Sequence, residues 1–317
     1  MKNDILSEME HNVKTNSFNA WLLAARPRTL TGAAVPVMIG VTLAYKDAGW
    51  DKFRIIPAIL CFLFAFIMQI DANFINDYFD CLKGNDDKET RLGPQRACSE
   101  GWITLHAMRW GLFFTSFFAA IIGVPLIYYG GMKMLVVGIF CMIFCFLYTT
   151  TLSYWGLGDL LVVVFFGIVP VCISYYVILP PSLQSITSQV FTASIACGLV
   201  IDTLLVVNNY RDRENDRRDK KLTLIVRIGE KNAELLYCLL GGMGVLLICI
   251  AYLMENNKMI IFSIAIILPY LYVHGKTYLE MKRINHGKGL NRTLSQTARN
   301  MFIFGILSSI GFLFLSN

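Results

Sequence analysis

Residues 239–253 read LLGGMGVLLICIAYL, and this stretch decides the fold class because apolar residues follow one another without a polar interruption. A strand of a membrane β-barrel would alternate apolar and polar residues with a period of two. Residues 160–168, LLVVVFFGI, have the same uninterrupted apolar character. Both stretches therefore predict membrane-spanning helices, which satisfy their backbone hydrogen bonds internally.

The composition of the whole chain agrees with a membrane protein. Of its 317 residues 56% are hydrophobic and only 16% are charged, whereas soluble domains carry about 25% charged residues. These values, with a mean hydropathy of +0.55, exclude an ordinary soluble enzyme. Because about 20 apolar residues suffice to cross a bilayer as a helix, the sequence predicts one all-α polytopic domain over residues 1–317 with nine transmembrane helices. The expected spans are 29–45, 55–79, 105–129, 133–153, 157–179, 187–210, 232–254, 258–279 and 298–316.

The basic residues predict the orientation of the chain. Only five of the 28 Lys and Arg residues fall on the side of the membrane opposite the N-terminus, namely Lys46, Lys52, Arg54, Lys133 and Lys258. Because Lys and Arg concentrate in cytoplasmic loops, we expect the N-terminus in the cytoplasm, the C-terminus outside, and the inner (cytoplasmic) membrane as the location. Residues 1–20 then form a polar cytoplasmic segment without a cleaved signal peptide, and 80–104 and 211–231 form cytoplasmic active-site loops. Lys and Arg residues beside the membrane serve orientation and contact with anionic membrane lipid, so the net charge of +6 needs no nucleic acid to explain it and no nucleic acid partner is expected.

A polar motif occurs twice, at the expected cytoplasmic ends of the second and sixth spans. Residues 76–80 read NDYFD and residues 208–212 read NNYRD, so both copies follow the pattern NxYxD. Two copies four spans apart predict an internal four-helix repeat, which places both motifs on one face of the membrane. Within each copy Asn and Asp lie four residues apart, so that their side-chain oxygens share one helix face.

Carboxylate and amide oxygens at this density predict a magnesium site. Mg²⁺ is usually held by one or two carboxylates, and water and substrate phosphate complete its shell, so the natural ligand is a diphosphate. We expect two ions, with Mn²⁺ as an alternative metal. Helix-end ion pairs at the membrane interface are the competing interpretation of the acids. The expected metal ligands are Asn76, Asp77, Asp80, Asp86, Asp212 and Asp216.

Other polar residues near the two motifs are candidates for substrate binding and catalysis. Arg offers bidentate contacts to phosphate and carboxylate, and the expected substrate-binding residues are Asn73, Arg91, Arg96, Asn208, Arg211, Lys221 and Arg227. The expected catalytic residues are Asp80, Asp212 and Asp216, together with Asp159, Tyr148 and Tyr154, which would position an aromatic acceptor or orient its hydroxyl. A tyrosine near the interface also fits the aromatic belt of a membrane protein. The sequence assigns no role to Asp71 or Asp202.

These motifs resemble those of the UbiA superfamily of membrane aromatic prenyltransferases over nearly the whole chain. The superfamily motifs correspond here to Asn76-Asp77-x2-Asp80 and Asp212-x3-Asp216. Gly84 departs from the general pattern, whereas Asp86 matches the branch that acts on 1,4-dihydroxy-2-naphthoate. Four further segments are similar to that branch, namely Arg26-Pro27-Arg28-Thr29-Leu30, Arg91-x-Gly93-Pro94-x-Arg96, Gly156-Leu157-Gly158-Asp159 and Lys221-x-Thr223-Leu224-x2-Arg227-x-Gly229.

The resemblance implies a UbiA-like helical bundle and a Mg²⁺-dependent reaction of menaquinone biosynthesis. A polyprenyl group would pass from polyprenyl diphosphate to the aromatic acid with loss of CO₂, giving demethylmenaquinol. Acceptors such as 4-hydroxybenzoate, homogentisate or a tetrapyrrole remain alternatives. A secondary transporter is the alternative from another class, because internal repeats and buried acids also occur there. Transporter sites lie near the bilayer midplane, however, and here the polar motifs lie at the ends of spans.

Overall fold

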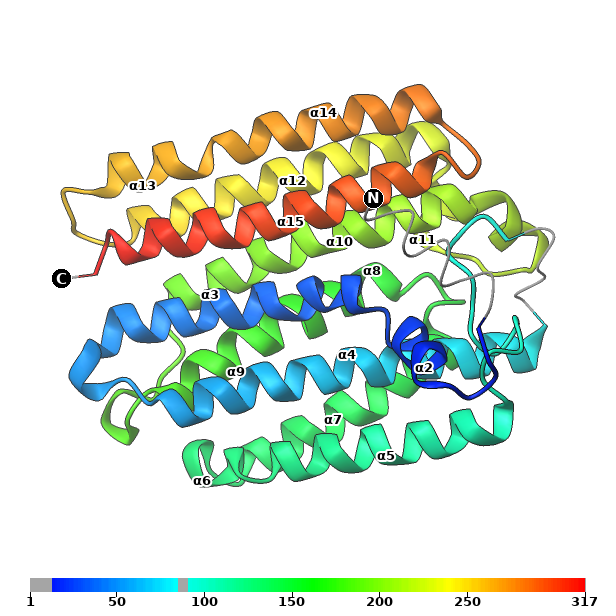
Figure 1. Cartoon of the computed structure of the whole chain (residues 1–317). Helices are drawn as coiled ribbons and strands as arrows, with labels where there is room; N and C mark the ends of the chain where they lie inside the picture. Colours follow the sequence, from blue (N-terminus) through cyan, green and yellow to red (C-terminus); the bar gives the residue numbers. More distant parts are fainter. Residues whose placement is uncertain (1–12, 85–90, 317) are drawn as a thin grey trace.

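The computed structural model describes residues 13–84 and 91–316, and within these ranges the chain forms helices and loops without a strand. The all-α class predicted from the uninterrupted apolar runs is therefore confirmed. Figure 1 shows the long helices lying side by side along one direction. The α-helices are α2 (Phe18–Ala25), α3 (Leu30–Ala48), α4 (Ile55–Lys83), α5 (Leu105–Gly123), α6 (Leu126–Gly130), α7 (Lys133–Leu147), α8 (Gly158–Val162), α9 (Val169–Ile178), α10 (Ser188–Arg218), α11 (Leu224–Ile228), α12 (Glu230–Leu253), α13 (Ile260–Ile267), α14 (Pro269–Ile284) and α15 (Leu290–Leu313).

Shorter helical turns connect some of these elements. Two of them are π-helical, and both extend an α-helix of the bundle: η3 follows α7, and η4 joins α8 to α9. π-helical segments often occur at functional sites. The short segments are η1 (Pro27–Thr29), η2 (Trp50–Lys52), η3 (Tyr148–Leu152), η4 (Val163–Ile168) and η5 (Pro181–Leu183).

The expected count of nine spans is wrong by one. In the part of the chain that the structure describes, eight helical segments are long and apolar enough to cross a membrane. The ninth expected span, 298–316, overlaps α15, which ends at Leu313, and this helix is not among them. α15 packs against α3, α10 and α13, but its packed face carries polar side chains, since Thr293, Thr297 and Asn300 are buried. Together with Asn291, Arg292, Gln296 and Arg299, these groups lower the hydropathy of the helix, which remains part of the bundle.

The long helix α10 lies at the centre and contacts α12, α15, α3 and η4. Its first turn is capped by Thr187, whose hydroxyl accepts a hydrogen bond from the Val190 N–H at 3.2 Å. Further along, a Cβ on Gly167 of η4 would lie only 2.5 Å from the Cα of Gly198 of α10. Such close backbone approach through glycine is typical of helix packing in membranes.

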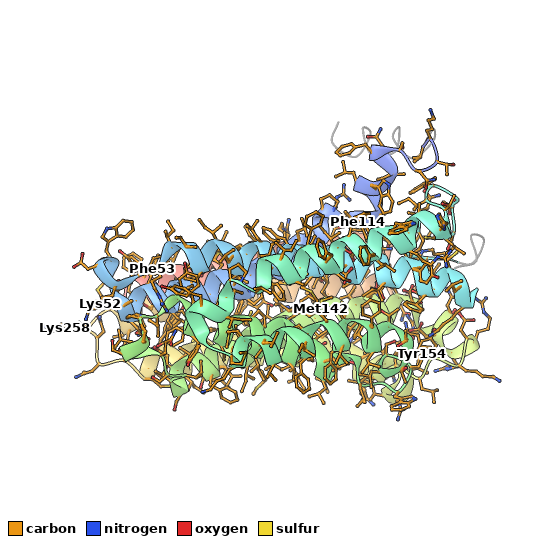
Figure 2. The ribbon with its side chains drawn as sticks, turned by 90° about the horizontal axis from the view of Figure 1, so that it is seen from below. Lys52, Phe53, Phe114, Met142, Tyr154 and Lys258 are labelled. Atoms are coloured by element: carbon orange, nitrogen blue, oxygen red, sulfur yellow. The ribbon has the colours of Figure 1, made fainter. Side chains whose placement is uncertain are left out.

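The second and sixth spans, α4 and α10, finish at the same end of the bundle, on the right in Figure 1. We call this the motif end. α4 stops there because Gly84 adopts the left-handed conformation (φ 70°), in which its N–H bonds back to the helix. Figure 2 shows Tyr154 at the motif end and Lys52 and Lys258 at the opposite end.

Candidate active site

One cavity of about 770 Å³ extends from the motif end into the interior between α4, α7, η4 and α10. Its lining is polar at the motif end and apolar further in, where it reaches Leu126 and Met134. The structure therefore brings the two NxYxD motifs to one site, as the repeat predicts. The motif residues on its wall are Asn76, Asp80, Asn208, Asn209, Arg211 and Asp212, and Asp216, one turn further along α10, also lines it.

Arg211 organises the second motif. It is buried, and its Nε and Nη2 donate to the two carboxylate oxygens of Asp212 at 2.8 and 2.5 Å. Nη2 also donates to Asn208 Oδ1, and Nη1 donates to Asn291 Oδ1 of α15, both at 2.8 Å. Gly93 packs on this guanidinium, because a Cβ there would lie 2.8 Å from Nη2. Arg211, expected to bind substrate, thus positions oxygens of the motif itself.

The first motif is held by partners from two other segments. Asp80 Oδ2 accepts a hydrogen bond from Arg96 Nη2 at 2.8 Å. Asn76 Oδ1 accepts one from the hydroxyl of Thr149, in η3, at 2.5 Å. Arg91 also lines the cavity, and its Nε donates to the carbonyl of Pro94 at 2.6 Å. The carboxylate and amide of this motif therefore face the cavity beside two arginines.

Asn73 and Asp77, also on α4, do not line the cavity. Asn73 Nδ2 donates to the Ala25 carbonyl and to the Thr29 hydroxyl, both at 2.9 Å. Asp77 is fully buried, and its Oδ1 accepts from Arg26 Nη2 at 3.2 Å. The structure thus places these two residues, expected to bind substrate and metal, where they fasten the corner between α2 and α3 to α4. Asp86, the remaining expected ligand, lies outside the described residues, as do residues 1–12 of the expected polar N-terminal segment.

Two carboxylates on the cavity wall have oxygens without a hydrogen-bond partner among residues 13–84 and 91–316. Asp216 has one such oxygen, Oδ2, while its Oδ1 lies 3.7 Å from Lys221 Nζ. Asp159, at the start of α8, is 8% exposed, and neither of its oxygens has a partner. Because a buried carboxylate oxygen without a partner is costly, both side chains offer acceptors to a molecule in the cavity.

The two expected tyrosines, Tyr148 and Tyr154, line the same cavity. Lys83 Nζ lies 4.1 Å from the centre of the Tyr154 ring, and Lys221 Nζ lies 6.0 Å from it. Cations at such distances over an aromatic ring are attracted by its negative face. Two lysines therefore lie close to the Tyr154 ring at the motif end: Lys83 from the end of α4 and Lys221 from the loop after α10.

Arg227 does not line the cavity. Its Nε donates to the carbonyl of Leu222 at 3.1 Å and its Nη2 to the carbonyl of Trp155 at 3.0 Å. The loop that follows α10 is thereby joined to the loop that precedes α8. The structure gives Arg227, expected to bind substrate, a role in positioning these loops.

Residues 33–287 match the UbiA prenyltransferase family. The chain belongs to this family. Among curated relatives, the 1,4-dihydroxy-2-naphthoate octaprenyltransferase of Escherichia coli is 34% identical over 242 residues, which cover 73% of this chain and 75% of that protein. The UbiA prenyltransferase domain-containing protein 1 homolog of Drosophila melanogaster is 28% identical over 303 residues, covering 90% and 77%.

Solved structures show the same fold. A UbiA homolog from Aeropyrum pernix has a TM-score of 0.67 and 14% identity, covering 90% of this chain and 97% of the other. A UbiA homolog from Archaeoglobus fulgidus, determined with GPP and Mg²⁺, has a TM-score of 0.63 and 16% identity, covering 92% and 99%. The UbiA-like helical bundle expected from the sequence motifs is confirmed.

Several residues of this UbiA site are missed when motif spacing alone is used. Asn291 bonds Arg211 and also donates from Nδ2 to the Leu92 carbonyl at 2.8 Å, so α15 takes part in the site. Nothing in the local sequence around Asn291 indicates this. Thr149 is missed for the same reason. Arg26, by contrast, belongs to the segment of residues 26–30 that resembles the family, and it lines the cavity and pairs with Asp77.

The two buried acids without a predicted role differ in their surroundings. Asp71 of α4 accepts hydrogen bonds from Thr115 and Ser116 of α5, the latter at 3.1 Å. These bonds join two neighbouring helices, so Asp71 serves helix packing. Asp202 of α10 is buried, and its Oδ1 has no hydrogen-bond partner among the residues that the structure describes.

The chemistry of the oxygen donors fits a hard divalent cation whose shell a ligand completes. Among the described residues no three or more His, Cys, Asp or Glu side chains gather closely enough to hold a metal by themselves. Mg²⁺ seldom needs such a set, because one or two carboxylates with water and phosphate oxygens satisfy it. The unpartnered Oδ2 of Asp216, beside Asp212 on one cavity wall and Asp80 on the other, supplies carboxylates of that kind.

Proposed function

We propose that this UbiA-family protein transfers a polyprenyl group from polyprenyl diphosphate to 1,4-dihydroxy-2-naphthoate with loss of CO₂, giving demethylmenaquinol. The observation that carries the proposal is 34% identity over most of the chain to a 1,4-dihydroxy-2-naphthoate octaprenyltransferase. The cavity supports it, because a polar end and an apolar interior suit a diphosphate head and a hydrocarbon tail. A polytopic membrane protein can take up such a tail without exposing it to water.

The reaction needs a leaving diphosphate and an electron-rich ring. The allylic C–O bond of the donor breaks and its electron pair leaves with the diphosphate. The ring carbon that bears the carboxylate bonds to the allylic carbon, and the electron pair of its bond to the carboxylate returns to the ring as CO₂ departs. No external oxidant or reductant takes part.

Mg²⁺ fits this scheme at the motif end. Asn76, Asp80, Asn208, Asp212 and Asp216 would hold it, supported by the UbiA homolog from Archaeoglobus fulgidus determined with GPP and Mg²⁺. When bound, the metal neutralises the charge that accumulates on the departing diphosphate. The proposal includes two ions, with Mn²⁺ as an alternative metal.

The remaining polar residues bind and orient the substrates. Arg91, Arg96 and Lys221 line the cavity near the carboxylates and would contact diphosphate or the acceptor carboxylate. Asp159, whose oxygens have no partner among the described residues, would accept a hydrogen bond from a ring hydroxyl. Tyr148 would pack beside the acceptor ring. The apolar interior would exclude water, which prevents capture of the allylic cation by hydrolysis.

Orientation and location complete the proposal. The Lys and Arg distribution favours the motif end, with the N-terminus, on the cytoplasmic side of the inner membrane and the C-terminus outside. The water-soluble aromatic acid would then reach the site from the cytoplasm, and the diphosphate head of the donor would lie on the same side, with its tail in the apolar interior.

The test is release of diphosphate and CO₂ from purified protein given 1,4-dihydroxy-2-naphthoate, octaprenyl diphosphate and Mg²⁺. We expect both products in equal amounts and neither after addition of EDTA. Parallel reactions with 4-hydroxybenzoate test the acceptor. Prenylation of 4-hydroxybenzoate with no product from the naphthoate would refute the proposed acceptor, and diphosphate release without any prenylated ring would refute prenyl transfer.

A further inference from the structure

Much of α7 forms a wall of the cavity, because all residues from 134 to 145 except Val136 and Phe140 line it. Met134, Gly138, Cys141 and Cys145 follow one another at helical spacing, and all line the cavity. Ile139 and Ile143 line the cavity and are also exposed on the outside of the protein, as is Phe140, which does not line it. In Figure 2, Met142 of this helix lies between the motif end and the opposite end of the bundle.

The hydrogen bond between Thr149 and Asn76 fixes the register of this wall against α4. α4 and α7 both run toward the motif end. A residue of α4 and a residue of α7 that precede Asn76 and Thr149 by the same number of positions therefore lie at a similar depth in the bundle. Eleven residues before Thr149 is Gly138, and eleven residues before Asn76 is Ala65; both line the cavity. At a rise of 1.5 Å per residue, this level lies about 17 Å from the bond.

Gly138 leaves open space at this level. An added Cβ there would meet no other residue within 4 Å. A Cβ on Gly123, another glycine of the cavity wall, would instead meet the Phe64 ring at 3.1 Å. The cavity continues past Gly138 to Met134 and Leu126, so this glycine lies along its length and not at its floor.

We propose that Gly138 determines how long a prenyl chain the cavity accepts. The inference rests on the proposed function, since it assumes that the donor's tail extends from the motif end along α4 and α7. An isoprene unit adds four chain bonds, or about 5 Å when extended, so a chain reaches the level of Gly138 at its third or fourth unit. The two units of a geranyl group end before this level, whereas geranylgeranyl and longer chains pass between Gly138 and Ala65.

The experiment compares Gly138→Leu with the matched control Gly242→Leu. Gly242 of α12 also leaves open space for a Cβ but does not line the cavity, and both changes replace a mid-helix glycine with a better helix former. The kcat/KM values are measured with geranyl, farnesyl, geranylgeranyl and octaprenyl diphosphate. We expect Gly138→Leu to lower the values for geranylgeranyl and octaprenyl donors at least about tenfold, with geranyl within about threefold of the wild type. Gly242→Leu should keep the wild-type profile.

The affinities of the same donors, measured with Mg²⁺ and without acceptor, separate this inference from the proposed function. If the wild type binds the donors but does not prenylate the naphthoate, the proposed acceptor is wrong, and the affinity series still shows whether long chains are selectively excluded. Ala65→Phe narrows the passage from the opposite wall and should give the same selectivity if Gly138→Leu does not fold. An equal loss for every donor, or unchanged use of long donors by the folded variants, would overturn the proposal, because the tail would then leave the cavity before this level.

Discussion

The guanidinium of Arg211 forms two parallel hydrogen bonds with the carboxylate of Asp212, the next residue of α10, at 2.8 and 2.5 Å. The same side chain reaches Asn291 of α15 and packs on Gly93. Three segments distant in sequence thus converge on one cation. Bidentate pairing fixes the orientation of a carboxylate as well as its distance, so Asp212 is held in place before any ligand arrives.

Replacing Arg211 by Lys should therefore lower activity although the charge is kept. A lysine offers one ammonium in place of the planar fork and cannot bond Asp212, Asn208 and Asn291 together. We expect kcat/KM to fall by about 10- to 100-fold, since small displacements of catalytic groups have effects of this size. The matched control is Arg292→Lys, at an arginine that is 73% exposed. Equal activity of the two variants would contradict the positioning role.

The carboxylates of the two motifs should be required for turnover but not for folding. Asp80→Asn and Asp212→Asn keep the side-chain shape and remove the charge, and we expect kcat to fall by about 10²- to 10³-fold, the usual effect of losing one group that stabilises developing charge. The apparent Mg²⁺ requirement, measured by titration, should rise in both variants. Asp51→Asn, in η2 near the opposite end, serves as control. Near-normal turnover of both motif variants at the wild-type Mg²⁺ requirement would refute the metal-binding role.

Sequence spacing predicts which side-chain oxygens of each motif share one helix face. Asn76 and Asp80 are four residues apart, and so are Asn208 and Asp212; helical geometry then places each pair on one face. Since α4 and α10 finish at the same end of the bundle, both faces open into one cavity. This part of the site is encoded locally, so it can be predicted without knowing the rest of the fold.

The roles of the flanking polar residues could not be predicted in the same way. Asp77 lies one residue from Asn76, and a turn of 100° directs it to Arg26 rather than to the cavity. Arg227 bonds carbonyls of two loops that are distant in sequence. Such roles depend on tertiary neighbours. The ninth span was wrong for a different reason, because polar residues such as Arg292, Gln296 and Arg299 make α15 less apolar than the eight spans.

Asn73 and Asn76 of α4 lie less than one helical turn apart, and replacing each by alanine should distinguish a structural role from a functional one. Asn73→Ala removes two hydrogen bonds to the corner between α2 and α3, which should cost about 1–3 kcal/mol and lower the Tm by several degrees. Asn76→Ala should lower kcat more than Asn73→Ala and change the Tm less, because Asn76 faces the cavity. Thermal unfolding in detergent and steady-state kinetics measure both effects. The reverse ranking would show that Asn73 is the functional residue.

The loop before α8 contains a glycine that should be essential for the geometry of the motif end. Gly156 has φ +73°, and a Cβ there would lie 2.8 Å from the Leu222 carbonyl oxygen and 3.1 Å from Arg227 Nε. Gly156→Ala should therefore have two effects. An alanine in the left-handed conformation costs about 1 kcal/mol, and its Cβ would push apart the loop that carries Tyr154 and the loop that carries Lys221. Gly287→Ala isolates the first effect, since Gly287 has φ +82° and no atom within 4 Å of an added Cβ. We expect both variants to lose a few degrees of Tm, but only Gly156→Ala to lose about tenfold or more in kcat/KM. If the two variants were equally active, contact between the loops would not be what holds the motif end in its working geometry.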